Sequence, residues 1–265
     1  FEDSNTFTLS AKIDSKEQIF MDWLSAPVIQ APQNSNEMID YGGQWSGEFR
    51  SQKTPWVTGV HLRESRSGTT SHANFPGLLI PTLGSSENSG SCYGFHYGWS
   101  GGHRMIAEQL PDGRRQIQFG NTENSEPTSG NSFETAKLFI CHSSNGVGGV
   151  GRSFRSHVAN SIIDLSKDSI RPVHYNCWEA IYFDHNIDQL IEIASLAFEI
   201  GAERFVLDDG WFKDRNNAKS SLGDWVVDKK KYPDGLHPLI KHINFLGMSF
   251  GLWFEPEMVS PVSDL

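Results

Sequence analysis

RFVLDD (204–209) is the stretch that decides the fold: a short apolar strand that ends in two adjacent carboxylates. A second buried strand is predicted upstream at CWEAIYF (177–183), and a third downstream at MSFGLWFEPE (248–257). Apolar residues at helical spacing fill both intervals between these strands. The order strand, helix, strand, helix, strand predicts parallel strands with right-handed crossovers, as in the first part of a (β/α)8 barrel or in a doubly wound sheet.

The two predicted helices carry clear start and stop signals. Asn186 is placed to cap the first helix, which ends at Gly201. The second helix follows the PDG turn (233–235) and ends at Gly247. The apolar faces consist of Ile187, Leu190, Ile191, Ala194, Ala197 and Phe198 in the first helix and Leu236, Leu239, Ile240 and Ile243 in the second. No GxGxxG phosphate loop follows the first or second strand, which favours the (β/α)8 TIM barrel, with about three of its eight strands in residues 171–265.

Residues 1–145 follow a different pattern, one of short alternating runs cut by turn residues. RQIQF (115–119), which follows a PDG turn, and ETAKLFI (134–140) are two of these runs. Alternation with period two and frequent Gly, Pro, Asn and Ser is typical of antiparallel strands, and many short strands predict a β-sandwich. We therefore expect a multi-domain chain whose N-terminal domain is all-β and incomplete at its start.

Residues 146–170 are predicted to link this sandwich to the barrel segment. After the glycine-rich run NGVGGVG (145–151), the apolar residues Phe154, Val158 and Ile162 recur at four-residue spacing. That spacing suits a connecting helix.

The composition excludes several classes of function. With 22 Lys+Arg against 32 Asp+Glu, a net charge of −10 and no basic stripe, we expect no nucleic-acid partner. No apolar run is long enough to cross a bilayer, so we expect no membrane partner. The three cysteines, 92, 141 and 177, fit neither a disulfide framework nor a zinc site, which favours a cytoplasmic location. Because the chain begins with Phe1 and stops at Leu265, directly after a strongly patterned segment, we expect a fragment of a longer protein.

Eight tryptophans, together with many Gly, Asp and Asn residues, indicate a sugar site. The apolar face of a pyranose ring stacks on aromatic planes, while carboxylates and amides bind its hydroxyls. The alternative for any single tryptophan is a place in the core, which the usual burial of this residue favours.

Asp208 and Asp209 are the first candidate site residues. Barrel active sites are assembled at the carboxyl ends of the strands, which is where this pair lies. Neighbouring carboxylates repel each other unless a ligand hydroxyl, a metal or a cation shares their charge. Trp211 would then supply an apolar wall. The alternative is that one aspartate caps the next turn and the other faces water.

Trp253, Glu255 and Glu257 end the predicted third strand, and their i, i+2 spacing places them on one face if the strand stays extended. Trp253 is the better candidate for binding a ligand. For Glu255 and Glu257, a structural role as a salt-bridged pair at the barrel rim is as well supported as a role in binding. Trp178 lies near the start of the predicted first strand, so its position there favours packing. The histidines show no HxxxH or HExxH spacing, and we expect no protein-bound metal.

Several runs closely resemble the alpha-galactosidases of glycoside hydrolase family 36. They are RFVLDDGWF (204–212), the stretch from SSLGDW (220–225) to WFEPEMVSPVSDL (253–265), and RPVHYNCWEAIYFDHN (171–186). YGGQWSGEF (41–49), LRESRSGTTSH (62–72) and YGFHYGWSGGH (93–103) look like pieces of that family's N-terminal β-sandwich. The resemblance therefore covers essentially the whole chain, more loosely before residue 145.

The resemblance implies hydrolysis of terminal alpha-1,6-linked galactose, as in melibiose and raffinose-type sugars, with retention at the anomeric carbon and no cofactor. It implies that Asp208 and Asp209 hold the 4- and 6-hydroxyls of galactose. It also implies that Trp253 and Trp178 line the sugar pocket. For the full-length protein it implies a homo-oligomer, commonly a tetramer, that binds a galactose-containing oligosaccharide.

The family's two catalytic carboxyls have no match in the chain. A retaining glycosidase needs a nucleophile and an acid/base. In this family the nucleophile ends the fourth strand in a Lys-Trp-Asp motif, and the acid/base lies on a later strand beyond a Cys and a Gly-rich loop. Neither motif occurs before Leu265, so the resemblance implies that both carboxyls lie beyond Leu265. We therefore name no catalytic residue and expect the isolated chain to be inactive.

Three alternatives to an alpha-galactosidase remain open at this point. Two share the family's fold: a raffinose-synthase-like galactosyl transferase and an alpha-N-acetylgalactosaminidase. The third is a non-catalytic carbohydrate-binding remnant.

Overall fold

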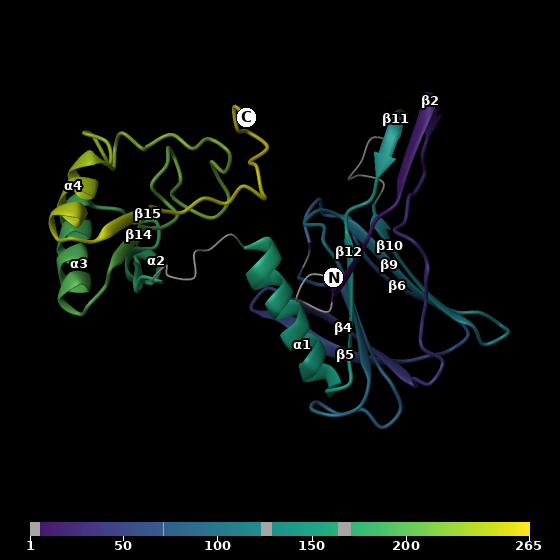
Figure 1. Ribbon diagram of the computed structural model, residues 1–265. Helices are drawn as coiled ribbons and strands as arrows, with labels where there is room; N and C mark the ends of the chain where they lie inside the picture. The colour runs from purple at the N-terminus through teal and green to yellow at the C-terminus, as the bar shows by residue number, and fades with distance from the viewer. Residues whose placement is uncertain (1–5, 71, 123–128, 164–170) are drawn as a thin grey trace. The chain divides into compact units, whose positions relative to one another are not determined.

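The computed structural model describes residues 6–70, 72–122, 129–163 and 171–265 (Figure 1). The chain separates into two compact units, residues 1–165 and 166–265. The first is built from antiparallel sheets, and the second around a parallel sheet with helices between its strands. This succession confirms the predicted fold class.

Within its described residues, the first unit contains two antiparallel sheets and one two-stranded ribbon. The larger sheet has its six strands in the order β1 (Thr6–Leu9), β12 (Leu138–Ser143), β8 (Cys92–Tyr97), β7 (Gly77–Pro81), β4 (Glu37–Gln44) and β5 (Gly47–Pro55). The smaller sheet has four strands in the order β3 (Ile29–Gln30), β10 (Arg115–Asn121), β9 (His103–Gln109) and β6 (Gly59–Ser65). The ribbon pairs β2 (Lys12–Phe20) with β11 (Ser129–Glu134).

The core of this unit draws on both sheets, as in a β-sandwich. Alternate side chains meet there: Met38, Leu78, Ile80, Phe95, Tyr97 and Leu138 from the larger sheet, and Met105, Ala107, Ile117 and Phe119 from the smaller. The Tyr97 hydroxyl is buried but paired, because it donates to Asn121 Oδ1 at 2.7 Å and accepts the Ala136 N–H at 3.1 Å. The Ala136 N–H thus bonds to a side-chain hydroxyl and not to the backbone of a neighbouring strand. The strand predicted at 134–140 is accordingly interrupted between β11, which ends at Glu134, and β12, which begins at Leu138.

Helix α1 (Gly146–His157) covers the outer face of the six-stranded sheet, and the π-helical turn η2 (Val158–Ile162) continues it. Val150 of α1 packs on side chains that point away from the sandwich core, namely Ile39, Leu79, Cys92 and Cys141. The helix begins inside the glycine-rich run. A Cβ on Gly149 would lie 2.0 Å from Ser143 Oγ, so glycine is what allows the helix to approach the strand so closely.

The second unit has a three-stranded parallel sheet of β13 (His174–Asn176), β14 (Arg204–Leu207) and β15 (Ser249–Leu252), with β14 in the centre. Its crossovers run through α3 (Ile187–Glu199) and α4 (His237–Phe245), which pack together. The predicted cap is confirmed, because the Asn186 side chain accepts from two backbone N–H groups in the first turn of α3. The predicted apolar faces contribute Leu190, Ala194, Ala197, Leu236, Leu239 and Ile243 to the core, whereas Phe198 is 47% exposed. No helix in the described ranges is long and apolar enough to cross a membrane.

The first strand of this sheet is not where the sequence predicted it. The prediction of a strand at 177–183 is wrong, because β13 ends at Asn176. The Asn176 Oδ1 accepts the Trp178 N–H at 2.8 Å and turns the chain into the short helix α2 (Trp178–Ile181). Trp178 therefore follows the carboxyl end of a strand and does not lie near the start of one.

The third strand is shorter than predicted. β15 ends at Leu252, because its pairing with β14 ends where β14 ends, at Leu207. Trp253, Glu255 and Glu257 therefore do not share one face of an extended strand.

Substitution of Gly94 in β8 tests the close seating of α1 on the sheet. A Cβ at this position would lie 2.4 Å from Val150 Cγ1, so we expect Gly94→Ala to displace the helix and to destabilise the unit by about 1–3 kcal/mol. Gly151→Ala is the matched control, because nothing lies within 4 Å of a Cβ there, and alanine in a helix is neutral or favourable. Urea denaturation measures both variants, and equal midpoints would contradict the seating.

Candidate functional site

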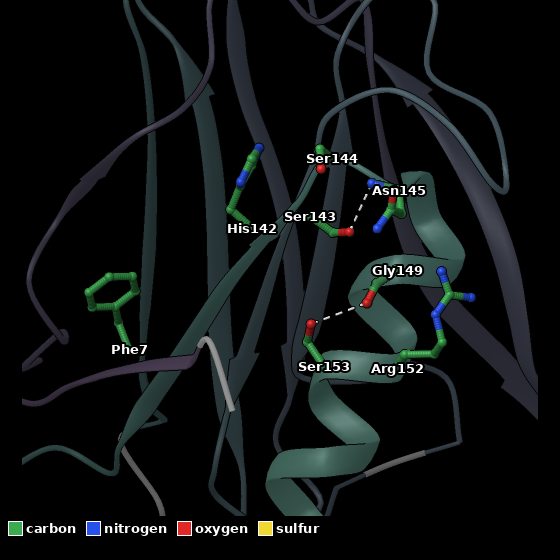
Figure 2. A pocket seen from close by; sticks show the side chains of 8 residues that line it. All are labelled: Phe7, His142, Ser143, Ser144, Asn145, Gly149, Arg152 and Ser153. Carbon is green, nitrogen blue, oxygen red and sulfur yellow. Dashed lines mark hydrogen bonds between the residues drawn. The ribbon is translucent and has the colours of Figure 1, made fainter. Parts of the chain in front are cut away.

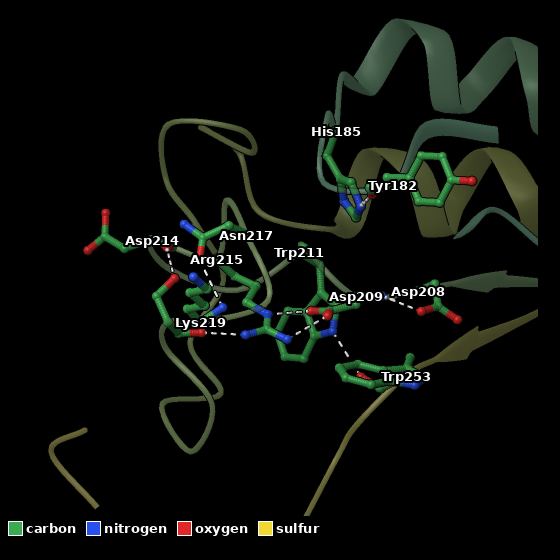
Figure 3. Close-up of polar contacts among 12 residues, drawn as sticks. Tyr182, His185, Asp208, Asp209, Trp211, Asp214, Arg215, Asn217, Lys219 and Trp253 are labelled. Atoms are coloured by element: carbon green, nitrogen blue, oxygen red, sulfur yellow. Dashed lines mark hydrogen bonds and ion pairs between the residues drawn. The ribbon is translucent and has the colours of Figure 1, made fainter. Parts of the chain in front are cut away.

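The carboxyl ends of the parallel strands bring Asp208, Asp209 and Trp253 to one edge of the sheet (Figure 3). The strands lie in register, with Asn176 opposite Val206 and Leu207 opposite Leu252. The Trp253 N–H, which directly follows β15, donates to the carbonyl of Leu207, the last residue of β14, at 3.0 Å. The residues that follow each strand therefore start from the same edge: Trp178, Asp208, Asp209 and Trp253.

Asp208 is 8% exposed and is held by neutral donors. Its Oδ1 accepts the backbone N–H of Asp209 at 2.7 Å, and its Oδ2 accepts from the side-chain amide of Asn176. Its own N–H donates to Cys177 Sγ at 3.4 Å, and burial raises the pKa of that thiol to about 11. Because a carboxylate has about four acceptor sites, Asp208 can still bind further donors.

Asp209 is 5% exposed and is paired with a cation from its own chain. Arg215 donates from Nε to Oδ1 at 2.9 Å and from Nη2 to Oδ2 at 2.8 Å. Arg215 is itself buried, and its Nη1 donates to the Ser220 carbonyl at 2.6 Å. This fork offsets the repulsion between the two aspartates. The sequence analysis did not identify Arg215. Its only signal in the sequence is its position six residues after Asp209, in a loop with several other charged residues.

Five aromatic side chains gather beside the aspartates: Trp211, Phe212, Trp225, Trp253 and Phe254, whose contacting rings have centroids 4.8 to 6.3 Å apart. Trp211 is 2% exposed, and its Nε1 donates to the Trp253 carbonyl at 2.9 Å. Trp225 and Trp253 are half-buried, and Phe254 is 49% exposed. Within this cluster the aromatic surface open to a ligand therefore comes from Trp225, Trp253 and Phe254, and Trp211 supports them from within.

Trp178 lies on the same edge, at the start of α2. It is half-buried and meets the rings of Tyr182 and Phe183 edge to face at 5.1 and 5.0 Å. Phe183 also lies under the guanidinium of Arg215, with Cζ 5.5 Å from the ring centroid. Aromatic contacts thus connect Trp178 to the cation that holds Asp209.

Glu255 and Glu257 follow β15 in an irregular segment that runs to Leu265, the last residue, which is 88% exposed. Glu255 is half-buried, and burial raises its pKa, with the negative charges of Glu257 and Asp209 adding to the effect. Glu257 is exposed. Within the described ranges neither acid forms an ion pair, so the salt-bridged rim pair is not seen there.

The resemblance implies that the two catalytic carboxyls lie beyond Leu265. The structure therefore does not test where they lie. The residues that it brings together at the strand edge are the candidates predicted for sugar binding: Asp208, Asp209, Trp178, Trp211 and Trp253.

His185 packs behind the turn that carries the two aspartates. Its Nε2 lies 3.0 Å from the Tyr182 carbonyl and its Nδ1 2.6 Å from the Tyr232 hydroxyl. Because a carbonyl can only accept, Nε2 carries the proton and Nδ1 accepts from Tyr232. Burial, assisted by the positive charge of Lys231, lowers the pKa of His185 to about 4, so the ring is neutral at pH 7.

Two pockets of the first unit contain none of the predicted site residues. One, of about 510 Å³, lies where β12 leads into α1 and is lined by Phe7, His142, Ser143, Ser144, Asn145, Gly149, Arg152 and Ser153 (Figure 2). The other, of about 1050 Å³, lies between α1 and the six-stranded sheet and is largely apolar. Neither offers the pair of carboxylates found in the second unit. Among the described residues no group of three or more His, Cys, Asp or Glu could hold a metal ion.

Removal of the buried cation tests the electrostatics of the aspartate pair. We expect Arg215→Gln to destabilise the protein by about 3–5 kcal/mol, because it leaves Asp209 buried without a countercharge. Lys230→Gln is the matched control from the same loop, because its side chain is 87% exposed and lies 3.6 Å from Asp214, and such pairs contribute at most about 1 kcal/mol. Denaturant titration measures both. A loss of under about 1 kcal/mol for Arg215→Gln would show that the pair does not carry this stability.

Protonation of His185 gives the stability a dependence on pH. The folded-state pKa of about 4 lies below the ordinary 6.5, so the unfolded chain binds the proton first as the pH falls. We expect the contribution of this group to be complete above pH 6.5 and to decline by about 3 kcal/mol as the pH falls to 4. His185→Gln should flatten that part of the stability curve, and the exposed His237→Gln should not. Parallel curves for wild type and His185→Gln would contradict the assignment.

Comparison with known proteins covers both units. Residues 132–265 match the Melibiase family model, and residues 1–128 match the model of the glycosyl hydrolase family 36 N-terminal domain. The chain is 40% identical over 243 residues to an alpha-galactosidase of Escherichia coli, a match that covers 91% of this chain and 34% of that protein. It is 36% identical over 276 residues to alpha-galactosidase AgaA of Geobacillus stearothermophilus, covering 100% of this chain and 37% of that protein.

Solved structures agree with these matches. A crystal structure of a variant of AgaA from Geobacillus stearothermophilus in complex with stachyose superposes with a TM-score of 0.91 at 34% identity, over 100% of this chain and 38% of that one. The galactosidase domain of AgaSK gives a TM-score of 0.90 at 31% identity, over 99% of this chain and 37% of that one. The chain spans about a third of the length of these relatives. With a family model matched over each unit, the chain belongs to glycoside hydrolase family 36.

Proposed function

We propose that the protein containing this chain is an alpha-galactosidase that hydrolyses terminal alpha-1,6-linked galactose from melibiose and raffinose-type oligosaccharides. The observation that carries the proposal is the buried pair Asp208 and Asp209, held at the strand edge beside an aromatic cluster in a family 36 chain. Variants of AgaA from Geobacillus stearothermophilus have been solved in complex with stachyose and with raffinose, which supports substrates of this class.

Asp208 and Asp209 are the proposed acceptors for sugar hydroxyls. Both are fixed before a ligand arrives, and the bidentate Arg215 uses only one acceptor site on each oxygen of Asp209. The 4-hydroxyl of galactose is axial where that of glucose is equatorial, so carboxylates placed for the axial group would leave glucose without these hydrogen bonds.

The aromatic side chains supply the apolar part of the proposed site. The half-buried rings of Trp253 and Trp178 offer faces on which a pyranose can stack. Trp211 holds the Trp253 main chain through its Nε1. Glu255, half-buried and within reach of the charge of Asp209, has a supporting role.

Neither aspartate suits the role of nucleophile. A retaining glycosidase places two carboxyls about 5 to 5.5 Å apart on either side of the scissile bond. Both oxygens of Asp209 instead accept from Arg215, and both oxygens of Asp208 accept hydrogen bonds. We therefore assign the nucleophile and the acid/base of a retaining double displacement to the part of the protein beyond Leu265.

The test of this proposal is hydrolysis of 4-nitrophenyl alpha-galactoside by the protein that contains this chain. We expect release of 4-nitrophenol from this substrate and not from the alpha-glucoside. Asp208→Asn is expected to lower kcat/KM about 10- to 100-fold, because a hydrogen bond to a charged group contributes about 1.5–3 kcal/mol. Asp214→Asn, which changes a 55% exposed side chain in the following loop, is the control and should leave kcat/KM unchanged.

Two results would contradict the proposal. Binding of galactose without turnover by the protein that contains this chain would favour a non-catalytic carbohydrate-binding remnant. Release of 4-nitrophenol by the purified 265-residue chain alone would show that the nucleophile lies within it and not beyond Leu265.

A further inference from the structure

The ammonium group of Lys231 is surrounded by main-chain oxygens. Its Nζ donates to the carbonyls of Phe183 at 3.0 Å, Gly210 at 2.8 Å and Arg215 at 3.0 Å. An ammonium has three donors, so all of them are used. Within the described ranges no carboxylate lies within 4.0 Å of this nitrogen. Lys231 therefore binds the backbone and not an acid.

The three carbonyls belong to segments that enclose Asp209. Gly210 follows Asp209 in the chain, and Arg215 is its ion-pair partner. Phe183 lies beneath the guanidinium of Arg215. Lys231 thus holds the main chain at three places: at Gly210 directly after Asp209, at Arg215, and at Phe183, whose ring contacts Arg215.

The backbone around Lys231 is itself held by hydrogen bonds to Asp228. The Lys231 backbone N–H donates to Asp228 Oδ1 at 3.4 Å, and the next N–H, that of Tyr232, donates to the Asp228 carbonyl at 2.9 Å. The Tyr232 hydroxyl donates to His185. A Cβ on Gly210, whose φ is +108°, would lie 2.9 Å from His185 Nε2, so the turn after Asp209 fits tightly against this support.

We propose that Lys231 is a positioning residue that holds the Asp208–Trp211 turn and the pair of Asp209 and Arg215 in the geometry that receives the sugar. The sugar's identity in this inference rests on the function proposed above; the contacts of the lysine do not. A turn that had to be ordered at each binding event would weaken binding by the entropy of ordering, whereas a turn that is already fixed avoids that cost.

The kinetic test uses the protein that contains this chain. Lys231→Met keeps most of the stem and removes the three donors. We expect the KM for 4-nitrophenyl alpha-galactoside to rise about tenfold, equivalent to one net hydrogen bond, with a smaller change in kcat, because the turn contacts the sugar in the ground state and the transition state alike. Lys230→Met, in the exposed neighbour, is the matched control and should change neither constant.

Lys231→Arg separates charge from geometry. It keeps the positive charge, but the planar guanidinium cannot aim three donors at three converging carbonyls as an ammonium does. We expect a KM between those of wild type and Lys231→Met. A KM equal to that of wild type in Lys231→Arg would show that charge alone is sufficient and would overturn the positioning by three hydrogen bonds.

A role in stability alone predicts a different pattern. A smaller folded fraction lowers kcat per mole of protein and leaves KM unchanged. An unchanged KM in folded Lys231→Met would therefore overturn the proposal. If Lys231→Met does not fold, Lys231→Gln and Lys231→Arg carry the test with the same readout.

Hydrogen exchange distinguishes failure of this inference from failure of the proposed function. The backbone amides of residues 208–216 should exchange faster in Lys231→Met than in wild type or in Lys230→Met. If the wild-type protein releases no 4-nitrophenol, the proposed function fails and exchange at 208–216 decides alone. Faster exchange in Lys231→Met would then support the holding role of the lysine, and unchanged exchange would overturn it.

Discussion

The burial of two adjacent carboxylates at the end of β14 is the constraint on which the second unit depends. Asp208 and Asp209 are both less than a tenth exposed, and a buried carboxylate without partners costs several kcal/mol. The partners come from separate elements: the amide of Asn176 from the end of β13, and the guanidinium of Arg215 from the loop after β14. The strand edge and the loop must therefore fold together, because neither satisfies the carboxylates alone.

Arg215 and Lys231 perform different tasks in the same loop. A guanidinium presents a planar fork that matches the two oxygens of one carboxylate, and Arg215 binds Asp209 in this way. An ammonium is a compact group with three diverging donors, and Lys231 reaches three carbonyls on three segments. The arginine balances charge, while the lysine fixes the course of the main chain, so exchanging the two residue types would satisfy neither requirement.

Sequence reasoning succeeded where the deciding interactions are local. The Asn186 cap, the helix stop at Gly201 and the strand at RFVLDD follow from residues close together in the chain. The structure has the cap, a helix that ends at Glu199 with Gly201 at a φ of +94°, and a strand that ends at Leu207, two residues earlier than predicted. It failed for the strand expected at 177–183, because the strand that pairs with β14 is instead the three-residue segment His174–Asn176. An apolar run gives no signal for where such pairing stops, and the turn made by the Asn176 side chain decided it. The same limit explains the missed site residues: Arg215 and Lys231 lie in a loop with several Lys and Asp residues, where a solvated charge is the ordinary expectation.

What distinguishes Lys231 from its exposed neighbour Lys230 is the tertiary position of its acceptors. The carbonyls of Phe183, Gly210 and Arg215 become neighbours only when the crossovers have folded and the loop has closed through the bridge between residues 212 and 227. Every residue carries a backbone carbonyl, so no sequence pattern indicates which carbonyls will bind a cation. The physical consequence can still be stated in advance: where a buried strand ends in two acids, a cation or neutral hydrogen-bond donors must lie beside them, and the loop that follows the acids is one place to search for these partners.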